Sequence, residues 1–224
     1  MDRASLRRDS AYAREDYDAE AEKLFKTLNL NRGDGAGSQF APVNAVFRHP
    51  NSGGVVYVGN IQAARSKEIL DEYNIRFIVN CQDVNSTNFH EGKAGFQYFR
   101  WPIAHWWRHR QQLLTHDGVR RYFAPFFSWV DRAIEAGGNV MIHCLAGAHR
   151  AGTSGVAYLM HKTKLPAIDA IKLAKKCRPI INPIHGLVDV LKLLDAAHRD
   201  EGRSTVGDAV GSGGAGSAAA SSAT

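Results

Sequence analysis

The chain has 224 residues, a hydrophobic fraction of 44% and a formal net charge of +6. These values are ordinary for a globular protein and predict one domain with flanking tails. The basic excess is compatible with an acidic partner, such as a phosphorylated substrate, a nucleic acid or an anionic membrane, and equally with improved solubility alone. The sequence has no run of about 18 apolar residues, so we expect no membrane span.

The three cysteines, Cys81, Cys144 and Cys177, form no CxxC pair, which argues against a zinc site or a disulfide framework. Such sparse cysteine usage fits a reducing compartment, in which a thiolate survives. The chain is charged from Asp2 onward and lacks the apolar core of a signal peptide. We therefore expect a cytoplasmic location, with the nucleus as the alternative.

Residues 1–44 are expected to form an N-terminal extension that is partly helical. Four apolar residues recur at the spacing of one helical face: Tyr17, Ala21, Leu24 and Leu28. The following residues 31–38, NRGDGAGS, have the composition of a turn or linker. The helix is either a regulatory or dimerising element or a helix that packs on its own domain.

Residues 45–199 are expected to form an α/β domain, because short β-branched segments alternate with amphipathic ones. The expected strands cover residues 55–58, 76–81, 96–101 and 140–142. The expected helices cover residues 63–73, 118–136, 153–161, 165–176 and 185–198. This order predicts a central, mostly parallel twisted sheet with helices on both faces. Residues 200–224 are rich in Gly, Ser and Ala and are expected to form a disordered tail.

The segment between Asn139 and Ser154 carries the chemistry. An apolar run leads to Cys144, a Gly-containing loop follows, and Arg150 closes the loop after five intervening residues. A loop between a strand and a helix can turn its N–H groups inward as an anion-binding nest, and Gly147 permits the tight turn. A helix N-terminus and nearby cations lower a thiol pKa from about 8.5 to roughly 3.5–7.5, which supplies a thiolate nucleophile.

The guanidinium of Arg150 offers a planar fork that matches two phosphate oxygens. The expected phosphate-binding residues are Leu145, Ala146, Gly147, Ala148, His149 and Arg150. His143 is expected to lie beneath the loop and to help hold Cys144. The alternative is a buried cysteine that merely ends a core strand, which is common for a lone cysteine. The preceding strand, together with His143, Gly147 and Gly152, favours the catalytic interpretation.

Residues 143–150, HCLAGAHR, resemble the HCxxGxxR signature of the protein tyrosine phosphatase superfamily. Segments 56–60, 74–80 and 178–183 are similar to motifs of the dual-specificity branch and follow in the same order. The resemblance covers about residues 45–198 and points to an atypical member of that branch.

The resemblance implies a two-step mechanism. Cys144 attacks phosphorus, Arg150 and the loop amides bind the phosphoryl oxygens, and water then cleaves the phosphocysteine. It implies phosphotyrosine and phosphoserine or phosphothreonine in proteins as substrates. It implies neither a metal nor an organic cofactor.

The aspartate that serves this family as general acid is missing from its usual place, where His105 follows residues 101–104, WPIA. Two candidates stay open. His105 is one, since a protonated imidazole can donate to a leaving oxygen. Asp117, from a loop that looks lengthened, is the other, although it is also placed to cap the next helix. A third alternative is a different acid, with Asp83 as a minor candidate, or no general acid at all.

Three further positions depart from the family or bear on its chemistry. Ala151 stands where Ser or Thr usually assists thiolate release, so we expect slow hydrolysis of the phosphocysteine, with Thr153 as a partial substitute. Ile184 replaces the asparagine expected after the proline of the last loop, which leaves the hydrogen bonding of that loop open. Cys81 is either a buried strand cysteine or a redox partner of Cys144.

The loop contains no lysine, whereas polyphosphoinositide phosphatases of the superfamily carry lysines there, which argues against a lipid substrate. The basic, aromatic residues 105–121, with Trp106 and Trp107, could wall a cleft for an acidic peptide or an RNA 5′-phosphate. Alternatively, the tryptophans pack in the core and the arginines are solvated. We favour a phosphoprotein over a nucleic acid, and a phospho-binding pseudophosphatase or scaffold is the non-enzymatic alternative.

Overall fold

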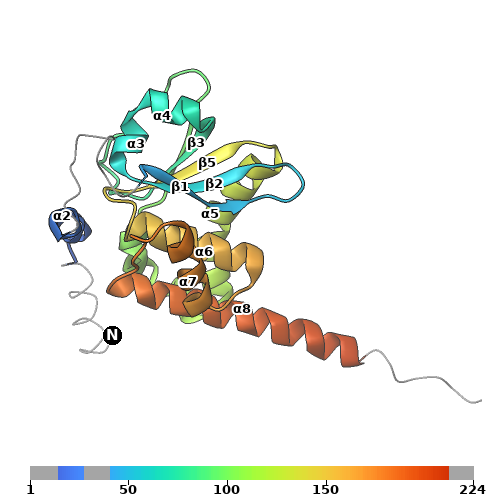
Figure 1. Ribbon diagram of the computed structural model, residues 1–224. Helices are drawn as coiled ribbons and strands as arrows, with labels where there is room; N and C mark the ends of the chain where they lie inside the picture. Colours follow the sequence, from blue (N-terminus) through green and yellow to red (C-terminus); the bar gives the residue numbers. More distant parts are fainter. Residues whose placement is uncertain (1–14, 28–40, 212–224) are drawn as a thin grey trace, which may run out of the picture.

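A five-stranded sheet forms the centre of the protein in the computed structural model, which describes residues 15–27 and 41–211, with side chains up to residue 201 (Figure 1). The strands are β1 (Val43–Arg48), β2 (Val55–Gly59), β3 (Ile75–Asn80), β4 (Gln97–Arg100) and β5 (Asn139–His143). Their order is β1-β2-β5-β3-β4, in which only the β1–β2 pair is antiparallel. The predicted mostly parallel α/β sheet is therefore confirmed, and β1 is an edge strand that the sequence interpretation missed.

Helices cover both faces of the sheet, as predicted (Figure 1). The helices are α3 (Ile61–Arg65), α4 (Lys67–Glu72), α5 (His116–Glu135), α6 (Arg150–Thr163), α7 (Ala167–Cys177) and α8 (Gly186–Gly211). Strand side chains alternate between the faces. Val140 and Ile142 join the large core with α5 and α6, whereas Met141 packs in a smaller core with Leu70 of α4. Because β5 is buried on both faces, packing holds its end in place, and the loop that begins at Cys144 follows directly from that end.

Several helix boundaries differ from the expected ones. The single helix expected over 63–73 is two helices, because Ser66 is extended and its hydroxyl caps α4 by accepting from the amide of Ile69 at 3.2 Å. α8 continues to Gly211, so a helix extends into the range expected to be a disordered tail. The expected linker 31–38 and residues 212–224 lie outside the described residues.

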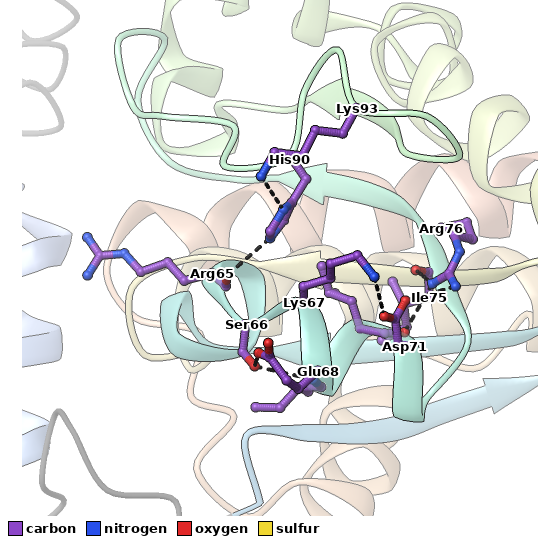
Figure 2. A network of polar contacts seen from close by, with 11 residues as sticks. Arg65, Ser66, Lys67, Glu68, Asp71, Ile75, Arg76, His90 and Lys93 are labelled. Atoms are coloured by element: carbon purple, nitrogen blue, oxygen red, sulfur yellow. Dashed lines mark hydrogen bonds and ion pairs between the residues drawn. The ribbon is translucent and has the colours of Figure 1, made fainter.

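The connection between β3 and β4 is fixed at its far end by a polar contact to the last residue of α3 (Figure 2). The ring Nε2 of His90 lies 3.1 Å from the carbonyl oxygen of Arg65, and the ammonium of Lys93 lies 3.3 Å from the other ring nitrogen. At the base of α4, the carboxylate of Asp71 pairs with Arg76 at 2.9 Å. The contact of His90 thus ties the connection to α3, and the Asp71–Arg76 pair ties α4 to the start of β3.

The near end of the same connection is held by two side chains from the strands. Arg100 of β4 donates to the carbonyl oxygens of Asp83 at 2.9 Å and Ser86 at 2.6 Å. Asn80 of β3 donates to the side-chain oxygen of Asn88 at 2.9 Å. Asp83 is therefore carried at the carboxyl edge of the parallel strands, which is also the edge that Cys144 occupies.

The predicted N-terminal helix exists as α2 (Tyr17–Thr27). Asp16 starts it by accepting hydrogen bonds from the amides of Asp18 at 3.1 Å and Ala19 at 2.9 Å. Of its predicted apolar face, Tyr17 and Ala21 are buried. α2 therefore packs on its own domain, which is one of the two roles expected for it.

Candidate active site

Cys144 immediately follows β5, at the carboxyl edge of the sheet, and is 2% exposed. The residue before it, His143, is fully buried. Burial lowers the pKa of His143 to about 3, so its imidazole is neutral at physiological pH. His143 is therefore a buried, uncharged neighbour of Cys144 at the end of β5.

A buried arginine holds the outer side of the loop that follows Cys144. Arg178, which is 1% exposed, donates from Nε to the carbonyl oxygen of Gly147 and from Nη2 to that of Ala146, both at 3.1 Å. Its Nη1 donates to the carbonyl oxygen of Ala41 at 2.9 Å and to the side chain of Asn44 at 2.6 Å. One guanidinium therefore anchors two loop peptides to the start of β1.

Backbone amides also hold the two neighbouring loop carbonyls so that they point outward. The amide of Ile61 donates to Leu145 at 3.0 Å, and the amide of Asn182 donates to Ala148 at 3.0 Å. In a trans peptide the N–H points opposite to the preceding carbonyl. Outward carbonyls at 145–148 therefore direct the N–H groups of residues 146–149 to the inner side of the loop, where they form an anion-binding nest.

The glycine of the loop is required by both conformation and space. Gly147 has a φ of +71°, in the left-handed region that favours glycine. A Cβ at this position would lie 2.5 Å from the carbonyl oxygen of Gly59 and 2.9 Å from Nη2 of Arg178. The tight turn that closes the nest therefore depends on a residue without a side chain.

Arg150 starts α6 and is 2% exposed. Burial opposes its charge, but the neighbouring Cys144 and Asp18 raise the pKa of the guanidinium. Nη2 of Arg150 donates to Oδ1 of Asp18, a residue of α2, in an ion pair. The predicted clamp thus faces a carboxylate from a distant part of the chain, which sequence inspection did not identify.

A cleft of about 440 Å³ opens beside this arginine, within the range of ~300–1,000 Å³ typical of ligand pockets. Its lining residues come from α2, from the β3–β4 connection, from the segment after β4 and from the loop arginine. They are Glu15, Asp16, Tyr17, Asp18, Asp83, Ala104, His105, Trp107, Arg108 and Arg150. Trp107 and Arg108 wall the cleft as expected, whereas Trp106 is 4% exposed and packs in the core.

His105 is the acid candidate that the structure brings to the cleft. It lies in the 3-10 segment η1 (Ile103–His109), which is followed by η2 (Gln112–Leu114). Its Nε2 lies 3.4 Å from Oδ1 of Asp83. Burial and the positive charge of Arg108 lower the pKa of His105, while Asp83 opposes that shift. Asp83, the minor candidate, is therefore a neighbour of His105 in the same cleft.

Asp117 lies elsewhere. It is in the first turn of α5, and its carboxylate accepts from Nη2 of Arg120 at 2.6 Å and from Nε at 3.2 Å. Among the described residues, those that line the cleft do not include Asp117. The helix cap is also a different residue, because Thr115 accepts from the amide of Gly118 at 3.0 Å.

Comparison with known proteins decides the family. Residues 56–196 match the family model described as dual specificity phosphatase, catalytic domain. The chain belongs to this family. The match confirms the resemblance inferred from residues 143–150, and it includes Cys144, the loop after it and Arg150.

Relatives and solved structures agree with this assignment. Human Dual specificity protein phosphatase 9 is 32% identical over 164 residues, which cover 73% of this chain and 40% of that protein. Drosophila melanogaster Dual specificity protein phosphatase Mpk3 is 29% identical over 130 residues, or 58% of this chain and 29% of that protein. The chain thus spans less than half the length of these curated relatives.

Two solved structures share the fold of this dual specificity phosphatase domain. Human DUSP28 superposes with a TM-score of 0.54 at 22% identity, covering 70% of this chain and 95% of that one. The human tyrosine phosphatase-like serine/threonine/tyrosine-interacting protein superposes with a TM-score of 0.53 at 21% identity, covering 70% and 97%. At these identities the likeness shows the fold alone.

The phosphatase domain has no hydroxyl at Ala151, and its two nearest helical hydroxyls are engaged elsewhere. Thr153, fully buried, donates to the carbonyl oxygen of His149 at 2.7 Å. Ser154 donates to the carbonyl oxygen of Arg150 at 3.0 Å. Both bonds run back along α6, so each hydroxyl is engaged by a carbonyl oxygen of its own helix.

Cys81 also lies near the catalytic loop of the domain. It is fully buried, and its Sγ lies 3.4 Å from the hydroxyl of Ser154. Burial raises the pKa of the Cys81 thiol, and the charge of Cys144 raises it further. Both cysteines are free thiols in the structure. Cys81 is therefore a core thiol close to the nucleophile.

The described residues offer no sign of other site types. They contain no group of three or more His, Cys, Asp or Glu side chains that could hold a metal ion. No helix within the described ranges is long and apolar enough to cross a membrane.

Proposed function

We propose that this protein is a cysteine-dependent phosphatase that hydrolyses phosphotyrosine and phosphoserine or phosphothreonine in proteins. One observation carries the proposal: the Cys144 thiol stands at the base of a nest whose amides at 146–149 face inward, with Arg150 at its rim. Inward N–H groups and a guanidinium match the charge that spreads over the three equatorial oxygens of a transferring phosphoryl group.

In the first step the Cys144 thiolate attacks phosphorus. The S–P bond forms as the bond to the ester oxygen breaks, and the leaving oxygen takes a proton from His105. In the second step water attacks the phosphocysteine, His105 takes a proton from that water, and the thiolate leaves. Inorganic phosphate and the dephosphorylated side chain are the products, and no co-reactant besides water is needed.

We assign the general acid to His105 and its orientation to Asp83. The 3.4 Å contact to Asp83 Oδ1 lets the carboxylate stabilise the protonated imidazole inside the cleft. Asp117 is bound to Arg120 at 2.6 Å, which supports a structural role at the start of α5. A histidine acid must be protonated, and the pKa of His105 lies below its usual 6.5. We therefore expect kcat/KM to fall as the pH rises through this lowered value.

The test compares phosphotyrosine, phosphoserine, phosphoinositide and RNA 5′-phosphate substrates on the wild type and four variants. Cys144→Ser should abolish phosphate release. His105→Asn should lower kcat/KM about 10²- to 10⁴-fold on alkyl phosphates, because a positioned acid contributes that much to the departure of the leaving group. Aryl esters, whose leaving groups need less protonation, should lose less. Asp83→Asn should move the pH profile, and Asp117→Asn should change neither.

The outcomes separate the alternatives. Turnover of the peptides that is lost in Cys144→Ser supports the protein phosphatase. Retained phosphopeptide binding without turnover in the wild type indicates a pseudophosphatase or scaffold. Preferential turnover of the RNA or lipid substrate indicates a non-protein phosphatase. Loss of activity in Asp117→Asn with retained activity in His105→Asn reverses the assignment of the acid.

The proposed chemistry also bears on location. A free thiolate nucleophile and free cysteines fit a reducing compartment. We therefore place the activity in the cytoplasm, with the nucleus as the alternative. Microscopy of a tagged protein tests this, and secretion or a compartment with an oxidising lumen would contradict it.

A further inference from the structure

We propose that α2 is a built-in competitor for the phosphate site, with the Asp18 carboxylate in place of a substrate phosphoryl group. The inference rests on the proposed function, because it takes Arg150 as the phosphate clamp. In the structure Asp18 Oδ1 accepts from Nη2 of Arg150. The Arg150 side chain is 3% exposed, whereas that of Asp18 is 45% exposed. A single carboxylate therefore covers the clamp from the solvent side.

An apolar contact seats α2 on the outer wall of the phosphate-binding loop. Ala21 is 2% exposed and packs with Ala146 and Ala148 of the loop and with Ile180 of the segment behind it. Leu24 and Phe25 of α2 pack against the same cluster. Ala21 lies three positions after Asp18, so both side chains belong to one helix face. The helix face that buries Ala21 therefore places the Asp18 carboxylate next to the guanidinium of Arg150.

Polar and aromatic contacts anchor the N-terminal end of α2 to a third segment. Oε1 of Glu15 accepts from the amide of Gly186, the first residue of α8, at 3.2 Å. The ring of Tyr17, which is 4% exposed, lies 6.5 Å from the ring of His185. α2 is therefore held across the cleft from the phosphate-binding loop to the start of α8.

The carboxylate is a weaker occupant than the group that it replaces. It has two oxygens and one negative charge, whereas a phosphoryl group presents three oxygens to Arg150 and to the inward amides at 146–149. A substrate therefore displaces Asp18, and its apparent affinity is reduced by the fraction of molecules in which the clamp is free. Because α2 must leave before the phosphoryl group enters, the competitor raises KM and leaves kcat unchanged.

The first test is Asp18→Asn, assayed with a phosphotyrosine peptide. We expect KM to fall about tenfold at unchanged kcat, the size expected for a lost hydrogen bond between charged groups. Glu20→Gln is the matched control, since it removes the same charge from a partly exposed residue of the same helix, whose carboxylate pairs with Lys23. Ala21→Glu is a second variant, which should undock the helix by placing a charge in its contact and lower KM likewise.

The second test needs no turnover. Tungstate, a tetrahedral oxyanion, is titrated calorimetrically into the wild type and into each variant. The Kd should fall about tenfold in Asp18→Asn and Ala21→Glu and stay unchanged in Glu20→Gln. Hydrogen exchange of the amides over residues 17–27 should accelerate when tungstate binds to the wild type. If no variant turns over any substrate but the Kd shifts appear, the competitor is supported while the phosphatase proposal fails.

Three results overturn the competitor. Equal tungstate Kd values in the wild type, Asp18→Asn and Ala21→Glu would show that α2 does not hinder the clamp. Unchanged exchange over residues 17–27 on tungstate binding would show that the helix does not move. A fall in kcat in Asp18→Asn, without a lower KM, would make Asp18 part of the catalytic machinery instead.

Discussion

Arg178→Met tests whether the nest is held from outside. Arg178 is 1% exposed and donates to the carbonyl oxygens of Gly147 and Ala146, each at 3.1 Å. It also donates to Ala41 and Asn44 at the start of β1. Methionine fills similar space but has no donor, so the substitution leaves the loop carbonyls without the partner that turns them outward.

Two opposing effects set how much Arg178→Met changes the free energy of unfolding. Each buried carbonyl left without a donor costs about 1–3 kcal/mol, so two cost roughly 2–6 kcal/mol. Removing a buried cation offsets part of this cost. Burial of Arg178 lowers its pKa to about 10, which shows that its charge is held at an electrostatic disadvantage. We expect a net loss of roughly 2–4 kcal/mol in the free energy of unfolding, because the cost of the carbonyls left without a donor exceeds the gain from removing the buried cation.

The functional effect should exceed the effect on stability. When the peptides after Ala146 and Gly147 are free to rotate, the N–H groups of the next residues no longer point reliably into the nest. Removing one such donor from an oxyanion site costs about 10²–10³ in kcat. Urea unfolding, kcat and tungstate affinity are measured on Arg178→Met, with Arg199→Met, a 63% exposed side chain, as control. Wild-type tungstate affinity and kcat in the folded Arg178→Met variant would refute the role of Arg178.

Three further outcomes follow from the same loop. Ala151→Ser should speed hydrolysis of the phosphocysteine and shrink the pre-steady-state burst that the wild type shows; a linear wild-type trace would contradict slow hydrolysis. Gly147→Ala should lower the free energy of unfolding by at least about 2 kcal/mol, from the strained φ and the approach to Gly59, as checked by urea titration. Peroxide should link Cys81 to Cys144 reversibly; two unlinked peptides on mapping of the oxidised protein would leave Cys81 as a core cysteine only.

The strand–loop–helix unit that carries Cys144 and Arg150 could be predicted because its geometry is local. Cys144 and Arg150 lie within one strand–loop–helix unit, so their spacing in the sequence determines their spacing in the structure. The same holds for the sheet, since each buried strand is a short apolar run. The helix expected over 63–73 was wrong for a local reason as well: its apolar spacing continues through Ser66, but the serine side chain caps a new helix there.

The supports of the site could not be predicted, because they join residues far apart in the chain. Arg178 and Gly147 are 31 positions apart, and Asp18 and Arg150 are 132 positions apart. A surface carboxylate such as Asp18 has no local pattern that distinguishes it from the other acids of its helix. The resemblance marked the segment containing Arg178 as a family motif, but only the fold shows which carbonyls that arginine holds.

The choice of His105 as acid has a consequence that depends on these distant contacts. In the free protein, burial and then Arg108 lower the pKa of His105, Asp83 opposes this shift, and Arg150 lowers the pKa further. A phosphoryl dianion bound at Arg150 brings negative charge into the same cleft, and an opposite charge nearby favours the protonated imidazole. The pH profile of kcat/KM reports the free protein, whereas that of the pre-steady-state burst rate reports the first step in the complex, because slow hydrolysis of the phosphocysteine limits kcat. We therefore expect the basic limb of the burst rate to lie at higher pH than that of kcat/KM, and both limbs to vanish in His105→Asn. Coincident limbs, or limbs that survive in His105→Asn, would assign the proton donor to another group.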